Sequence, residues 1–206
     1  MIDILAVFIT FFAVIDPIGT LPVFIAITDK YDNKTKRRVA LLATIVSACV
    51  LIFFMVVGEL ILNALSIPLP AFQISGGIVL FLFALSMIFG DSKPDEEIKL
   101  LEKSHKETAI FPLAVPSIAS PGAMLAAVLL TENGIFSLWE QVQTGLVMLS
   151  VLVLAYILML LAGGITKIIG SSGASVISRV MGLILSSIAV TNILTGFTDY
   201  YRILNS

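Results

Sequence analysis

Six long apolar stretches decide what this chain can fold into. They cover roughly residues 4–28, 39–63, 70–90, 109–131, 142–165 and 176–198, and each reaches the length of about 20 apolar residues that spans a bilayer as a helix. The 206-residue chain is 58% hydrophobic and only 13% charged, whereas a soluble domain carries about 25% charged residues. The sequence therefore predicts an all-α membrane protein with six transmembrane helices, forming one integral membrane domain over residues 1–206.

Basic residues are concentrated in alternate connections between these stretches. The first, third and fifth connections hold all of the 12 Lys and Arg residues except Arg202. Because positive charge marks cytoplasmic loops, this pattern predicts a multi-pass protein of the plasma (inner) membrane with both termini outside. Asp3 and the length of the first apolar run do not fit a signal peptide, so we expect the first segment to stay as a transmembrane helix.

The first apolar stretch is interrupted at its middle by residues 16–22, which contain an acid, a glycine and two prolines. Asp16 lies about 20 Å from either end of the stretch, given the α-helical rise per residue. A carboxylate at that depth is costly and usually functional, and proline removes a backbone donor and blocks a continuous helix. Irregular backbone at membrane depth is tolerated only inside protein or beside a wet cavity. We therefore predict a helix 1 that is broken around a site facing a water-accessible hollow.

The second half of the chain resembles the first half. Gly77 and Ala84 match Gly182 and Ala189 at an offset of 105 residues. Each half (about 1–92 and about 106–206, with a cytoplasmic connection over about 91–108) holds three spans, so the halves must have opposite orientations. Inverted repeats with a proline-interrupted segment at matching places are typical of secondary transporters.

At nearly the same offset, 104 residues, Asp16-Pro17 aligns with Ser120-Pro121. A second register stays open, in which Pro17 and Pro22 pair with Pro116 and Pro121. Both registers predict that helices 1 and 4 are broken in the middle of the membrane.

Asp16-Pro17 and Ser120-Pro121 also share a local signal for a helix start. Asp and Ser are good N-caps, and proline suits the first helical position. A helix start inside the membrane would favour an anionic group such as a carboxylate. Asp16 could then bind an ammonium group or couple transport to an ion, so the pattern suits a small zwitterion. The candidate substrate-binding residues are Asp16, Pro17, Gly19, Thr20, Ser117, Ser120, Pro121, Gly122 and Asn192.

Each candidate also has a purely structural interpretation. Asp16 and Ser120 could simply cap their half-helices, and Thr20 and Ser117 could donate to carbonyls of their own helices. Asn192 could form hydrogen bonds between helices, and Gly76 and Gly77 could allow helices to pack closely.

Other function classes find little support in the sequence. The single cysteine, Cys49, lies in an apolar run, so we expect neither a disulfide nor a metal site, and no cofactor. Residues that could form a catalytic site are not placed together in the membrane, which argues against an enzyme, and no basic patch with aromatic residues suggests nucleic acid. The third connection predicts a short amphipathic helix with an Asp95–Lys99 pair, near the only histidine, His105.

Residues 16–24, 74–78 and 115–123 together resemble the MarC family of integral membrane proteins. The resemblance implies six helices in two inverted halves, with helices 1 and 4 broken around the substrate. It also implies transport of small neutral amino acids such as glycine or alanine, driven by an ion gradient. Ser120 stands where relatives often have glycine, and the second helix lacks an acidic residue that some transporting relatives place there for the amine.

The leading hypothesis is a secondary transporter of small neutral amino acids or similar zwitterions, coupled to protons or sodium, with alternating access between the two halves. One alternative is a metabolite or drug exporter with a more apolar cavity. The other is a membrane scaffold that transports nothing and whose prolines serve only packing. The expected partners are a small-molecule solute, a coupling ion and the lipid bilayer.

Overall fold

The computed structural model describes residues 2–89 and 109–205, and every regular element in these residues is a helix. The all-helical prediction is confirmed for this part of the chain. The elements, in order, are α1 (Ile4–Ile15), α2 (Thr20–Thr28), α3 (Asn33–Ala64), α4 (Leu69–Phe89), η1 (Ala109–Ile118), α7 (Pro121–Leu129) and α8 (Leu138–Leu204).

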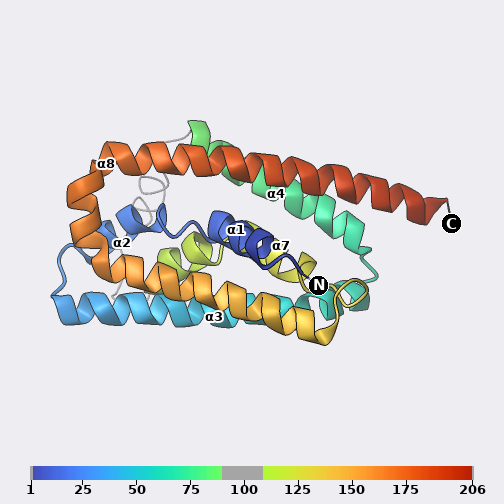
Figure 1. Ribbon diagram of the computed structural model, residues 1–206, viewed down its shortest axis with the longest axis horizontal. Coiled ribbons are helices and arrows are strands. Elements are labelled where there is room, and N and C mark those ends of the chain that lie inside the picture. Colours follow the sequence, from blue (N-terminus) through green and yellow to red (C-terminus); the bar gives the residue numbers. More distant parts are fainter. Residues whose placement is uncertain (1, 90–108, 206) are drawn as a thin grey trace.

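Four helical stretches are long and apolar enough to cross a membrane on their own. These are α3, α4 and two parts of α8, Leu138–Gly164 and Arg179–Leu204. Figure 1 shows α8 doubling back between its two parts, so that the second part runs beside α4. Only 22–33% of the residues in the most apolar windows of these stretches are buried inside the protein. The apolar side chains left outside far exceed what a soluble monomer exposes, and they suit contact with lipid.

Two further pairs of helices are bent at a short break. The axes of α1 and α2 differ by 41°, and those of η1 and α7 differ by 55°. The predicted breaks in the first and fourth apolar stretches are therefore confirmed. With the bent pairs, the described residues contain four to six candidate membrane spans.

The bent pairs lie in the centre of the molecule. Figure 1 shows α1, α2 and α7 between a layer of α3 with the first part of α8 and a layer of α4 with the second part of α8. The cluster of buried apolar residues runs through all of these helices. Both termini lie toward the same end of the molecule (Figure 1).

The helix before the second break is irregular because it contains two prolines. Phe111 and Val115, which precede Pro112 and Pro116, both have extended backbone (φ −132°, ψ 123°) inside η1. A residue before proline is pushed toward this region by clash with the proline ring. The first half of the fourth apolar stretch is thus a widened helix rather than a regular one.

The second part of α8 packs tightly on α4 through glycines. A Cβ built on Gly77 of α4 would lie 3.1 Å from the carbonyl oxygen of Ala189, and a Cβ on Gly182 of α8 would lie 3.0 Å from that of Ala84. The two backbones are therefore in near contact at both places, as small residues allow in membrane helices. The packing role predicted for Gly77 is confirmed.

Two further predictions concern Cys49 and the third connection. Cys49 is exposed on α3, which agrees with a lipid-facing residue. The predicted amphipathic helix with Asp95 and Lys99, together with His105, falls outside the residues that the structure describes.

Candidate functional site

Asp16 organises the break between α1 and α2. Its backbone is left-handed (φ 48°, ψ 66°), and its N–H donates to the carbonyl of Phe12 at 3.1 Å, which ends α1. Its Oδ1 accepts from the N–H of Gly19 at 2.9 Å, and its carbonyl accepts from the N–H of Thr20 at 3.1 Å. An N-cap residue shows this pattern, in which its side chain accepts from the backbone N–H three residues later and its carbonyl accepts from the N–H four residues later. Asp16 therefore ends one helix and starts the next.

The regular part of α2 nevertheless begins at Thr20, later than the predicted start at Pro17. Residues 17–19 form a tight turn, in which the N–H of Leu21 bonds to the carbonyl of Ile18 at 3.1 Å instead of continuing the α-helical pattern. Gly19 is required in this turn because a Cβ there would collide with the Asp16 carboxylate, whose Cγ would lie only 2.7 Å away.

The second break follows the sequence prediction directly. Ser120 has extended backbone (φ −71°, ψ 159°), its Oγ accepts from the N–H of Ala123 at 3.1 Å, and Pro121 is the first helical residue of α7. The same Oγ donates to the carbonyl of Val14 in α1 at 2.7 Å. That carbonyl lies in the last turn of α1, where the break removes its helical donor. Ser120 therefore caps its own half-helix and satisfies the other broken helix.

A second contact joins the two breaks. The hydroxyls of Thr20 and Ser117 lie 3.3 Å apart, and Thr20 Oγ1 also donates to the carbonyl of Asp16 at 3.0 Å. Asp16, Thr20, Ser117 and Ser120 are each at most 1% exposed. We call these four residues the break cluster. It is a polar site enclosed among apolar helices, where both interrupted segments meet.

Ser47 of α3 also borders this region and was not among the predicted site residues. Its Oγ lies 2.9 Å from the carbonyl of Ala43 and 3.2 Å from that of Ala114 in η1, and its side chain is fully buried. It supplies a hydrogen bond to the irregular backbone of η1. The signal was present in the sequence, because Ser47 shares a helix face with the small residues Ala40 and Ala43.

The other predicted site residues lie around or apart from the break cluster. Pro17 belongs to the turn after Asp16. A Cβ on Gly122 would collide with Leu80 and lie 3.5 Å from Val14, so side chains of α4 and α1 cover its backbone. Asn192 is half-buried on the second part of α8, and no hydrogen bond among the described residues links it to the cluster. The predicted water-accessible hollow at Asp16 is closed in this conformation, because the side chain is only 1% exposed.

Comparisons with known proteins also indicate a membrane protein. Residues 1–201 match the model of the MarC family, described as MarC family integral membrane protein. The chain belongs to the MarC family. It is therefore an integral membrane protein, and the resemblance seen in residues 16–24, 74–78 and 115–123 is confirmed.

Several curated relatives of this MarC protein match along nearly their full length. A UPF0056 membrane protein of Buchnera aphidicola subsp. Schizaphis graminum is 32% identical, covering 98% of this chain and 100% of the relative. One from Methanocaldococcus jannaschii is 34% identical, covering 92% and 93%. The UPF0056 membrane protein YvbG of Bacillus subtilis is 31% identical, covering 98% of both chains. No solved structure matches this chain.

Proposed function

We propose that each bent pair of helices is a single broken membrane span, so that the protein crosses the plasma membrane six times with both termini outside. Bends of 41° and 55° let the chain continue across the membrane, whereas a re-entrant loop would have to return toward the side it entered from. The position of both termini at one end of the molecule agrees with an even number of crossings (Figure 1). The basic residues of alternate connections set the orientation.

We further propose that the two three-helix halves are inverted repeats. The packing of α4 on α8 supports this, because Gly77 approaches the carbonyl of Ala189 while Gly182 approaches that of Ala84. The offset of 105 that relates Gly77 to Gly182 also relates Ala84 to Ala189. The contact is thus reciprocal between matching residues, as an approximate two-fold axis requires.

In this arrangement the protein would act as a secondary transporter of small neutral amino acids or similar zwitterions, coupled to protons or sodium. The observation that carries the proposal is the meeting of both helix breaks at the buried break cluster. The start of α7 at Ser120 would favour a substrate carboxylate, and the Asp16 carboxylate would favour an ammonium group or a proton. The site would admit only a small solute, because Thr20 and Ser117 lie 3.3 Å apart and Leu80 covers Gly122.

This conformation would then be an occluded state of an alternating-access cycle. Opening toward either side would separate the two broken helices, and this breaks two contacts between them. These are the hydroxyl pair of Thr20 with Ser117 and the bond from Ser120 to the carbonyl of Val14. Both are single neutral hydrogen bonds, each with a net contribution of about 1 kcal/mol, so binding of a substrate could offset their loss.

Ligand-induced thermal stabilisation of the purified protein tests this function. Glycine or alanine at a concentration far above the dissociation constant should raise the melting temperature by roughly 5–10 °C. Asp16→Asn should abolish the rise, because the amide keeps the oxygen that accepts from Gly19 but loses the charge. Asp3→Asn is the matched control, since Asp3 is also a capping carboxylate, to Leu5 and Ala6, but lies outside the cluster.

Two results would contradict the proposal. Stabilisation by bulky apolar compounds alone would favour an exporter with an apolar cavity. A folded protein that moves no solute across proteoliposomes under proton or sodium gradients, with Asp16→Asn folding normally, would favour a membrane scaffold.

A further inference from the structure

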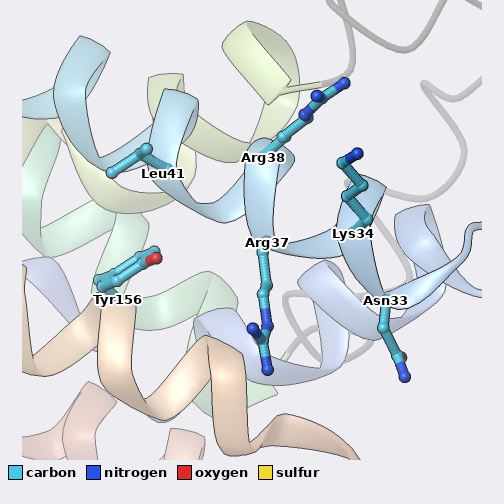
Figure 2. A pocket seen from close by; sticks show the side chains of 6 residues that line it. All are labelled: Asn33, Lys34, Arg37, Arg38, Leu41 and Tyr156. Atoms are coloured by element: carbon cyan, nitrogen blue, oxygen red, sulfur yellow. The ribbon is translucent and has the colours of Figure 1, made fainter.

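The end of the molecule opposite both termini carries a basic face on α3. Lys34, Arg37 and Arg38 lie in the first turns of α3 at spacings of i, i+3 and i+4, and Leu41 follows one turn after Arg37. All three basic side chains are exposed. Together with Asn33 and with Tyr156 from the first part of α8, they line an open cavity of about 480 Å³ (Figure 2).

Among the described residues, no acidic side chain compensates the charge of this face. No acidic residue lines the cavity, and none of the ion pairs among the described residues involves Lys34, Arg37 or Arg38. The nearest acid in sequence, Asp32, instead caps α3 by accepting from the N–H of Thr35 at 3.3 Å. Figure 2 shows Arg37 extending from α3 toward α8, while Lys34 and Arg38 extend together on another side of the helix. The cavity therefore offers cationic donors to an anion.

The surface next to these cations is apolar and exposed. Leu41 is 47% exposed and Ile45, one turn further along α3, is 49% exposed. On the facing part of α8, Val153 and Ile157 are also exposed. Tyr156 lies between the basic and apolar regions, the position that amphipathic aromatic rings prefer at a membrane interface. A cationic region beside an exposed apolar surface suits a phospholipid better than a free ion.

We propose that this cavity binds the headgroup of an anionic glycerophospholipid from the surrounding leaflet. Lys34 and Arg38 would contact its phosphate, Arg37 would add positive charge on the side of α3 that faces α8, and the acyl chains would lie along Leu41 and the exposed residues of α3 and α8. Basic pockets between transmembrane helices recognise such headgroups by their charge. The site is separate from the break cluster, so this inference does not depend on the proposed transport.

Lipid retention by the full chain tests the site. Protein purified in detergent is given phosphatidylglycerol or phosphatidylcholine, and bound lipid is counted by native mass spectrometry while the melting temperature is followed. The site variant is Lys34→Gln/Arg38→Gln. The matched control is Lys30→Gln/Lys36→Gln, which removes the same two charges from the same region but from residues that do not line this cavity. A third arm gives inorganic phosphate alone.

The expected result is that phosphatidylglycerol binds and stabilises the wild type and the control, whereas phosphatidylcholine and inorganic phosphate do not. The site variant should bind phosphatidylglycerol on the order of tenfold more weakly. Equal loss in site and control variants would overturn the proposal in favour of general surface charge. Full stabilisation by inorganic phosphate would overturn it in favour of a free-anion site, and equal retention of phosphatidylcholine would remove the role of charge altogether.

Discussion

Asp16 serves two helices with different parts of the same residue. Its backbone N–H donates to the carbonyl of Phe12 and closes the last turn of α1. Its carboxylate and its carbonyl accept from the N–H groups of Gly19 and Thr20 and begin the next turn. Substitutions can separate this capping role from the proposed role in binding a solute, because asparagine keeps an oxygen acceptor but loses the charge.

Asp16→Ala should destabilise the protein by about 1–3 kcal/mol relative to Asp16→Asn. Alanine removes the acceptor for the buried N–H of Gly19, whereas asparagine keeps an oxygen there. Unfolding of the two variants in the same detergent, followed by circular dichroism, measures the difference. Equal stability of the two variants would show that the cap contributes nothing.

Ser120→Ala should also be destabilising, by about 2–3 kcal/mol, because it removes the cap of α7 and leaves the carbonyl of Val14 without its donor. Ser150→Ala is the control, since the exposed Ser150 donates only to Val147 within α8. The same unfolding assay should find that variant within about 0.5 kcal/mol of the wild type. A similar loss in both variants would refute the link between the two breaks.

Glu132, in the connection before α8, gives a pH-dependent prediction. Burial, followed by the charges of Glu59 and Asp199, raises the pKa of Glu132 above its ordinary value of 4.5. The folded state therefore binds this proton more tightly than the unfolded state does. The resulting stability is present below pH 4.5 and is lost as the pH rises through the raised pKa.

Glu132→Gln should accordingly be more stable than the wild type at pH 7, with a melting temperature higher by roughly 1–2 °C, and the gap should close toward pH 4.5. Glu59 is no equivalent control, because it accepts from the N–H and the Nδ2 of Asn133 at 2.9 and 2.8 Å. Asp29→Asn, at the exposed end of α2, is the better comparison. A gap that stays constant between pH 4.5 and 7 would contradict the raised pKa.

At the residue scale, the sequence predicted helix caps but not the contacts between residues of different helices. Ser120 and Pro121 carry a local signal that needs no partner, and the structure confirms it. The hydroxyl pair of Thr20 and Ser117 could not be predicted, because it depends on the relative depth of two helices far apart in the chain. The same holds for the burial of Asp16, since sequence spacing gives depth in the membrane but not what packs around it.

At the scale of the elements, glycines fix how closely α4 and α8 approach. Gly77→Val and Gly182→Val should each destabilise the protein by about 1–3 kcal/mol, because the new side chains would meet backbone carbonyls that cannot move aside. Similar losses in both variants are expected from their reciprocal contacts.

Gly163→Val is the matched control for these two variants. No atom lies within 4 Å of a Cβ built on Gly163, so the larger side chain has room. Thermal unfolding in detergent compares the three variants. A loss in Gly163→Val as large as in the other two would mean that helix propensity, rather than packing, sets the cost.

The apolar stretches predicted the long helices well, since length and hydropathy alone determine whether a segment can span lipid. They did not predict the irregular backbone of η1, although Pro112 and Pro116 supplied the cause. The distortion depends on how neighbouring groups bond to the irregular backbone, as Ser47 does at the carbonyl of Ala114, and this is a property of packing. The start of α2 was placed too early for a related reason, because the turn after Pro17 is tighter than an α-helical turn.

At the scale of the whole molecule, the proposed transport requires the two broken helices to separate. A disulfide between Thr20→Cys and Ser117→Cys, in a Cys49→Ser background, would tie them at the point where their hydroxyls lie 3.3 Å apart. The same preparation can be assayed oxidised and reduced, so any effect of the substitutions themselves is held constant.

The decisive measurement is uptake of glycine or alanine into proteoliposomes that contain this double-cysteine protein. Uptake that is present after reduction and absent after oxidation is the predicted result, because the crosslink holds the break cluster closed. Uptake at the same rate in both forms, with the disulfide verified by mass spectrometry, would contradict the central claim that the two breaks must part for a solute to pass.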